Sequence, residues 1–270
     1  MNDIIRKIAD KNTKNTGDYL DSEGFLVCCK CHTRKECEHE FPLHSGKKRK
    51  FPIMCRCDRE EELRYKQNQA QIIQQKRLEK LYSKGLTDQA YRKNTFSLDD
   101  GRNKEVTKLC MQYVKNWEKL KEQNCGIIFY GDTGGGKSFY SCCIANALIH
   151  KGVSVLVSRL SDLVKNRVDD RESSFSVKNF ELIVLDDIGA ENYTQTAYNI
   201  IDDIYRSNIP LIVTTNLSPS MMKRPSTIEQ KRIFDRVIER CCITQKVDVY
   251  KSRLELAHKK REQAMRILQM

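Results

Sequence analysis

The chain has 270 residues, of which 39% are hydrophobic and 31% charged, and its formal net charge is +12 at pH 7. No apolar run approaches the length of a membrane span, and the N-terminal stretch MNDIIRKIADKNTKN carries charges where a signal peptide would be apolar. These features predict a cytoplasmic protein without a membrane partner. The positive charge favours an anionic partner, with nucleic acid ahead of a membrane surface.

Half of the 12 cysteines crowd into the first 57 residues. Because the cytoplasm keeps thiols reduced, they need an explanation other than disulfide bonds. Cys28-x-x-Cys31 and Cys55-x-Cys57 form two thiolate knuckles, and such pairs build tetrahedral zinc sites. Residues 1–57 are therefore predicted to form a small zinc-binding module. Four further residues are also possible zinc ligands: Cys29, Cys37, His39 and His44. Of these, His44 is the main alternative, in place of one of the later cysteines.

The remaining cysteines are scattered along the chain: Cys110, Cys125, Cys142, Cys143, Cys241 and Cys242. Cysteine is among the most frequently buried residue types and behaves in a core as a small hydrophobe. We therefore expect these residues to be reduced and buried.

A polar helix is predicted from Asp58 to about Gly85, in the stretch DREEELRYKQNQAQIIQQKRLEKLYSKG. Strong helix formers dominate this stretch, proline is absent, and the final glycine can cap the helix. Its apolar residues are too sparse for a buried helix, so most of its length should be exposed. Residues 58–95 are thus expected to connect the cysteine module to a larger domain, residues 96–270.

Beyond about Phe96, short apolar runs alternate with helical patterns. The runs GIIFYG, VSVLVSR, FELIVLDD and PLIVTTN are rich in β-branched residues and nearly continuously apolar, as buried parallel strands are. Helical patterns lie between them at about 137–150, 160–168 and 194–207. This alternation predicts an α/β fold with a doubly wound parallel sheet.

The stretch GDTGGGKS follows the first of these strands and opens a helix. It fits the full Walker A pattern, in which small residues let backbone N–H groups curl around phosphates. The lysine is expected to reach the β- and γ-phosphates of a nucleotide, and the serine hydroxyl to bind Mg²⁺. The predicted nucleotide-binding residues of this loop are Gly131, Asp132, Thr133, Gly134, Gly135, Gly136, Lys137 and Ser138.

Two carboxylates and an amide follow the next buried strands. Asp186 and Asp187 come after LIVL, at the carboxyl edge of the sheet, where ligands bind in open α/β folds. Asp186 is expected to hold the Mg²⁺ shell, and Asp187 to orient or deprotonate the water that attacks the γ-phosphate. Asn216 ends PLIVTTN and would bond this water or the γ-phosphate if its strand lies beside that of Asp186.

The stretch IEQKRIFDRVIERC predicts an amphipathic helix. One face is apolar, and three arginines at four-residue spacing lie on another face: Arg232, Arg236 and Arg240. An ATPase that acts between subunits needs an arginine supplied in trans to stabilise the transferring charge. This helix offers candidates for that arginine.

Five motifs in this order resemble the AAA+ core of the DnaC/DnaI helicase loaders and of their relatives, the IstB transposition ATPases: GDTGGGKS, LIVLDDIGAE, IVTTN, FDRVIERC and YKSR. The resemblance spans roughly residues 95–255. It implies a P-loop AAA+ fold and a nucleotide site that a neighbouring subunit completes. An N-terminal domain with cysteine pairs is similar to the loaders and not to the IstB proteins.

The resemblance also implies roles for single residues. By motif position, it supports the nucleotide-site roles given above to the Walker A residues and to Asp186, Asp187 and Asn216. It also implies that Arg236, in the motif FDR, is the arginine finger. Lys251 or Arg253 of YKSR occupies the second sensor position, and both stay open, with Arg253 taken as the nucleotide-binding candidate. The tail LELAHKKREQAMRILQM runs further than the shorter loaders lead us to expect, and its role is open.

The family resemblance, the zinc module and the basic charge favour an ATP-dependent loader of a hexameric replicative DNA helicase onto single-stranded DNA. Its cofactors would be ATP, Mg²⁺ and Zn²⁺, its ATPase activity weak and stimulated by DNA or a partner, and its active form a homo-oligomer. A transposition helper ATPase shares the core but leaves the zinc module unexplained. A nucleotide-sensing regulator that binds DNA or inhibits a helicase is a third hypothesis.

Overall fold

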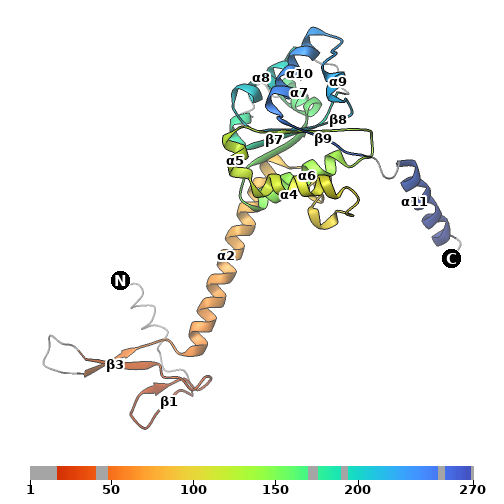
Figure 1. Cartoon of the computed structure of the whole chain (residues 1–270). Helices are drawn as coiled ribbons and strands as arrows, with labels where there is room; N and C mark the ends of the chain where they lie inside the picture. The colour runs from red at the N-terminus through yellow and green to blue at the C-terminus, as the bar shows by residue number, and fades with distance from the viewer. Residues whose placement is uncertain (1–16, 41–47, 170–175, 190–193, 249–252, 269–270) are drawn as a thin grey trace. The chain divides into compact units, whose positions relative to one another are not determined.

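The structure is a computed structural model that describes residues 17–40, 48–169, 176–189, 194–248 and 253–268 (Figure 1). The chain divides into two compact units, Met1–Gln75 and Lys76–Met270. Among the helices of the described ranges, none combines the length and the apolar composition that a membrane crossing requires.

The N-terminal unit contains two small antiparallel hairpins. Strand β1 (Tyr19–Leu20) pairs with β2 (Leu26–Val27), and β3 (Glu36–Glu40) pairs with β4 (Lys48–Pro52). Most of these strand residues are exposed or half-buried, and those of β3 and β4 are mostly polar. A unit with so little apolar burial needs a further source of stability, such as a bound metal.

A buried ion pair joins the residue before β1 to the residue before β3. Lys35 Nζ lies 2.7 Å from Asp18 Oδ2, and both side chains are fully buried. The other oxygen of Asp18 accepts a hydrogen bond from the backbone N–H of Cys29. Because a buried charge is costly unless it is paired, this contact fixes residue 18 against the loop that carries the first cysteines.

Helix α2 (Arg56–Gly85) follows directly, and it is largely exposed as the sequence predicts. Its last turns differ, because Leu78, Leu81 and Tyr82 pack on the core of the second unit. The helix ends at Gly85, where a Cβ atom would lie 2.0 Å from the carbonyl oxygen of Val155. Only glycine allows the chain to approach the sheet so closely at this point.

The second unit is built on a five-stranded parallel sheet of order β6-β7-β8-β5-β9. The strands are β5 (Ile127–Tyr130), β6 (Val155–Arg159), β7 (Leu182–Ile188), β8 (Leu211–Thr215) and β9 (Ile243–Lys246). The four predicted strands are present, and both faces of the four are buried. Strand β9 is a fifth strand that the sequence did not indicate.

Helices cover both faces of the sheet (Figure 1). One layer contains α4 (Lys104–Lys115) and α6 (Lys137–His150), and the other contains α7 (Leu160–Asp169), α8 (Gln195–Arg206) and α10 (Ile228–Arg240). Successive residues of β5 point into opposite layers, so each layer has its own apolar core. This is the predicted doubly wound α/β fold. Shorter elements and the tail helix complete the unit: α3 (Gln89–Arg92), η1 (Phe96–Leu98), α5 (Trp117–Glu122), η2 (Val177–Asn179), α9 (Pro219–Met222) and α11 (Arg253–Leu268).

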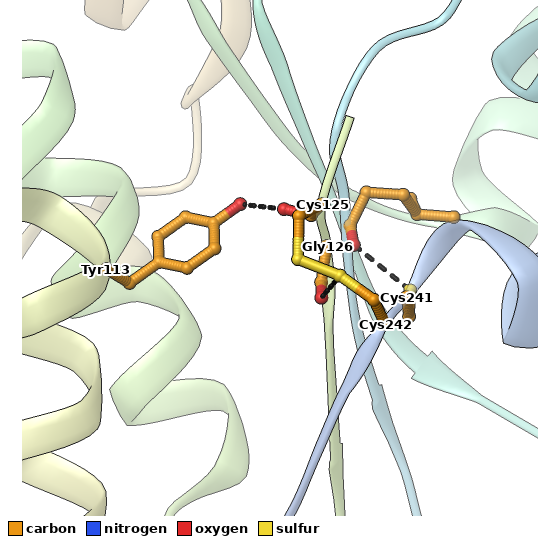
Figure 2. Close-up of a disulfide and its surroundings, with 6 residues drawn as sticks. Tyr113, Cys125, Gly126, Cys241 and Cys242 are labelled. Atoms are coloured by element: carbon orange, nitrogen blue, oxygen red, sulfur yellow. Dashed lines mark hydrogen bonds between the residues drawn. A yellow bond between two sulfur atoms is a disulfide. The ribbon is translucent and has the colours of Figure 1, made fainter. Parts of the chain in front are cut away.

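Cys125 and Cys242 are joined by a disulfide bond (Figure 2), with their Cα atoms 5.7 Å apart. The expectation that both are reduced, buried thiols is wrong in this structure. Cys125 lies two residues before β5 and Cys242 directly before β9, and these neighbouring strands pair at their first residues, Ile127 and Ile243. Because the sequence did not reveal β9, it gave no reason to place these cysteines side by side.

The other scattered cysteines do lie in the core as free thiols: Cys110, Cys142, Cys143 and Cys241. Burial raises the pKa of the Cys142 and Cys143 thiols to about 12. The Cys241 thiol donates to the carbonyl oxygen of Leu211 at 3.1 Å (Figure 2). These four therefore act as small apolar residues, as the sequence predicts.

Candidate nucleotide site and metal centre

The glycine-rich loop between β5 and α6 depends on backbone conformations that favour glycine. Gly131, Gly134 and Gly136 have φ angles of 137°, 97° and 94°. A Cβ atom on Gly131 or Gly135 would lie 2.5 or 2.8 Å from the carbonyl oxygen of Val247, which follows β9. Side chains at these positions would displace the loop, so the glycines keep its N–H groups available at the start of α6.

Lys137 lies at the first position of α6 and is buried, with 8% of its surface exposed. Its Nζ donates to the carbonyl oxygens of Gly131 at 2.8 Å and Asp132 at 2.9 Å. It also donates to the side-chain oxygen of Asn216 at 2.8 Å. The ammonium group therefore joins the glycine loop to the end of β8, and phosphate oxygens can replace these neutral acceptors.

Strand β8 lies between β5 and β7, so the glycine loop, Asn216 and Asp186 all lie at the carboxyl edge of three adjacent strands. The role expected for Asn216 required that its strand lie beside the strand of Asp186, and the structure meets this condition. This edge is where open α/β sheets bind ligands. The geometry thus brings the predicted phosphate-binding and acidic residues together.

Asp186 and Asp187 lie where the pairing of β7 with β8 shifts between Leu185 and Ile188. Irregular pairing of this kind redirects side chains. Asp187 has a φ of 62°, a left-handed conformation that Asp and Asn tolerate better than most residues. The irregularity leaves the Asp187 side chain exposed, whereas Asp186 is buried with 4% exposure.

Two hydroxyl groups donate to the buried carboxylate of Asp186. Thr214 Oγ1 donates to Oδ1 at 2.6 Å, and Tyr91 donates to Oδ2 at 2.9 Å. Thr214 also accepts from the backbone N–H of Asp187 at 2.8 Å, which holds the backbone of the second aspartate in place. Burial, and then the charge of Asp186, raise the pKa of Tyr91 above its usual value, so its hydroxyl stays a donor. Sequence reasoning missed both hydroxyl residues, although Thr214 lies within the quoted IVTTN.

A cavity of about 250 Å³ adjoins the glycine loop. Residues of the segment before α4 line it, together with aromatic rings of α6 and the loop itself: Leu98, Asp99, Asp100, Arg102, Asn103, Gly134, Gly135, Gly136, Phe139, Tyr140 and Asp248. A mixture of flat rings and polar groups beside a phosphate loop suits a nucleoside.

Arg236 lies on α10 and points toward α8 of the same chain. Its guanidinium lies 2.6 Å from Asp202 Oδ1, donates to the Tyr198 hydroxyl at 2.7 Å and stacks 4.6 Å from the centre of the Tyr198 ring. Asp202 also pairs with Arg206 at 2.8 Å. An arginine that acts in the site of a neighbouring subunit has to leave this ion pair. The second sensor is not placed, because Lys251 and the side chain of Arg253 lie outside the described residues.

The N-terminal unit brings four sulfur atoms together. The Sγ atoms of Cys28, Cys31, Cys55 and Cys57 all lie within 4.8 Å of one another. The Sγ atoms of Cys55 and Cys57 lie 3.1 Å apart, and those of Cys28 and Cys57 lie 3.5 Å apart. Sulfurs around a tetrahedral zinc ion at 2.3 Å are about 3.8 Å apart, so the chemistry and the spacing of this group fit zinc.

The loop between the first two cysteines has the tight turn of a knuckle. The N–H of His32 donates to the carbonyl oxygen of Cys28, and His32 has a φ of 54°. Burial alone would raise the pKa of the Cys31 thiol, but hydrogen bonds, first from Thr33, lower it to about 5. Of the alternative ligands, Cys29, Cys37 and His39 are not in the four-sulfur group, and His44 lies outside the described residues.

A family profile described as IstB-like ATP binding protein matches residues 53–261, well over half of the chain. The chain belongs to this family. The match includes the glycine loop, both aspartates and the arginine helix, but it begins after Cys28 and Cys31. Membership of the family therefore describes the ATP-binding unit and does not describe the whole four-sulfur group.

Individual relatives of the family agree with this assignment. The chain is 29% identical over 135 residues to the replicative helicase loader DnaC of Escherichia coli. The aligned region covers 47% of this chain and 54% of DnaC. It is also 29% identical over 105 residues to a protein of Sinorhizobium fredii described as an insertion-sequence ATP-binding protein, which covers 37% of this chain and 35% of that protein. The chain thus matches about half or less of the length of these relatives.

A solved structure shares the fold of the second unit. The crystal structure of a protein described as a primosome component, from Streptococcus pyogenes, superimposes with a TM-score of 0.51 at 24% identity. The match covers 63% of this chain and 93% of that one. The α/β fold of the larger unit is therefore shared with this solved structure.

Proposed function

We propose that this protein is an ATPase that loads a hexameric replicative DNA helicase onto single-stranded DNA. The observation that carries this proposal is the presence, in one chain, of an IstB-like ATP-binding unit and a separate four-sulfur module. The similarity to DnaC supports the same function. The net charge of +12 suits a protein that works on a nucleic acid.

ATP binding would follow from the geometry of the glycine loop. The N–H groups at the start of α6 and the ammonium of Lys137 receive the β- and γ-phosphates, and the cavity beside the loop receives the nucleoside. Ser138 and Asp186 would hold Mg²⁺, which when bound neutralises phosphate charge in the transition state. Because phosphate replaces Asn216 as a partner of Lys137, the amide of Asn216 is released toward the attacking water.

Asp187→Asn is expected to bind ATP with unchanged affinity and to hydrolyse it more slowly. The substitution removes the charge that orients the water, while asparagine keeps the size and tolerates the left-handed φ of 62°. General-base groups typically contribute about 10²- to 10⁴-fold to a rate. Single-turnover hydrolysis and fluorescent-nucleotide titration measure the two quantities separately. Equal turnover in the variant and the wild type would assign the water to another residue.

Arg236→Ala is expected to bind ATP nearly normally and to hydrolyse it poorly, because the finger acts in the site of a neighbouring copy. Losses for such arginines reach about 10³-fold or more. Mixing this variant with Lys137→Ala subunits should restore part of the activity, since some sites then contain both intact halves. The matched control is Arg206→Ala, which removes the other partner of Asp202. A mixture no more active than its components would contradict the shared site.

The four-sulfur module would hold the helicase. We expect the intact protein to co-elute with the replicative helicase of its own organism in size-exclusion chromatography. In the presence of ATP, the protein should also allow that helicase to unwind a forked duplex whose single-stranded region has no free end onto which the helicase could thread by itself. Lys137→Ala should keep the association and lose the loading. A chain that leaves the helicase unbound under all nucleotide conditions would contradict the proposal.

The match to an insertion-sequence ATP-binding protein favours a second candidate function, a helper ATPase for a transposase. This alternative shares the nucleotide site but assigns no role to the cysteine module. Parallel binding measurements with the helicase and with the transposase of a neighbouring element separate the two functions. Association with the transposase alone would favour the helper.

A further inference from the structure

Tyr91 contacts the acidic residue of the nucleotide site from a part of the chain that precedes the sheet. It lies on the four-residue helix α3, between the end of α2 and the core, and its side chain is half-buried. Its hydroxyl donates to Asp186 Oδ2 at 2.9 Å, while Thr214 donates to Oδ1 at 2.6 Å. Both oxygens of this buried carboxylate therefore have a fixed donor from the protein.

The backbone around Tyr91 is held by a buried amide. Asn146 of α6, 1% exposed, donates to the carbonyl oxygens of Tyr91 at 2.9 Å and Asn94 at 2.8 Å. Its own side-chain oxygen accepts from the Tyr82 hydroxyl of α2 at 3.0 Å. A continuous series of hydrogen bonds thus runs from the end of α2, through α6 and α3, to Asp186.

The end of α2 is attached to the same turn by an arginine. Arg92 donates from Nε to the carbonyl oxygen of Leu86 at 2.7 Å and stacks 5.0 Å from the centre of the Tyr82 ring. Together with Asn146, it fixes the position of α3 on both of its sides. The Tyr91 hydroxyl is therefore presented to Asp186 from a preorganised turn and does not depend on a free side chain finding its partner.

We propose that Tyr91 is a positioning residue of the magnesium site, which sets the orientation of the Asp186 carboxylate. With one lone pair on each oxygen engaged by Tyr91 and Thr214, the plane of the carboxylate is fixed and the remaining lone pairs stay available to the metal shell. The inference rests on the proposed ATP site. It adds that the segment leading from α2 controls how strongly that site responds to magnesium.

Tyr91→Phe tests the inference, because it removes only the hydroxyl and keeps the ring in place. Affinity for a fluorescent ATP analogue is titrated in EDTA and then at increasing Mg²⁺. We expect the nucleotide affinity in EDTA to be unchanged. The Mg²⁺ concentration that gives half of the Mg²⁺-dependent increase in affinity should be roughly tenfold higher than in the wild type, as it is for other residues that support metal ligands. Tyr113→Phe is the matched control, since it removes a buried hydroxyl that donates to the carbonyl oxygen of Cys125, outside this series of hydrogen bonds. It should respond to Mg²⁺ like the wild type.

Three results would overturn the inference. Tyr91→Phe could respond to Mg²⁺ like the wild type, or respond at a lower concentration, which would make the hydroxyl a competitor of the metal. It could also lose affinity equally with and without Mg²⁺, which a purely structural role predicts. A wild-type chain that binds no nucleotide would instead overturn the proposed ATPase function, and this inference with it.

Discussion

Lys137→Ala is expected to abolish ATP hydrolysis and to weaken ATP binding roughly 10- to 100-fold. A hydrogen bond to a charged group contributes about 1.5–3 kcal/mol, and each 1.4 kcal/mol is a factor of ten in affinity. The loss has a second cause in this chain. The same ammonium group joins Gly131, Asp132 and Asn216, so its removal also loosens the loop before any nucleotide arrives.

Lys151→Ala provides a matched control for this variant. Lys151 caps the end of α6 opposite the glycine loop and donates to the carbonyl oxygen of Val114. The substitution Lys151→Ala removes a lysine charge at the other end of the same helix, and it should leave nucleotide affinity unchanged. Equilibrium titration with a fluorescent nucleotide and steady-state hydrolysis measure both variants. Equal affinity of Lys137→Ala and the wild type would place the phosphates elsewhere.

The double variant Cys55→Ser, Cys57→Ser is expected to lose zinc and to unfold the N-terminal module while the ATP-binding unit stays folded. Apparent binding free energies of structural zinc reach about 10–16 kcal/mol, far more than the small apolar core of this unit contributes. The larger unit has its own sheet and two apolar cores, so it does not depend on the metal. The variant should therefore lose its zinc, measured by mass spectrometry, and its co-elution with the helicase. Its nucleotide affinity should remain that of the wild type.

Cys29→Ser and Cys37→Ser are the controls, because both are cysteines of the same unit outside the four-sulfur group. Each should keep one equivalent of zinc. A metal-free wild-type protein would contradict the zinc site. A double variant that still binds the helicase would move the docking surface to another part of the chain, such as α2 or the basic tail.

The sequence predicted the sheet well where its strands are buried on both faces. Helix α6 begins and ends at the predicted residues 137 and 150, because a glycine loop precedes it and its apolar run ends there. Strand β9 escaped prediction because its ITQK sequence is an edge strand, with alternating half-buried and exposed residues and no apolar run. The hairpins of the first unit escaped for a related reason, since strands such as ECEHE and KRKFP are polar.

The candidate site was predictable where a motif fixes local geometry. The glycine loop, Asp186 and Asn216 follow from their positions at the ends of strands. Tyr91 and Asn146 did not, because their contacts join residues far apart in the chain, and a lone tyrosine or asparagine carries no local signal. The disulfide partners were hidden in the same way.

The bond between Cys125 and Cys242 closes a covalent ring around the part of the chain that carries the nucleotide site. Lys137, Asp186 and Arg236 all belong to this ring, whose ends are 117 residues apart in sequence. In the chain-entropy description, a closure of that length restricts the unfolded chain by about 5 kcal/mol. A protease cut at one point of the ring also leaves both pieces joined until the bond is reduced, so the halves of the site remain on a single molecule.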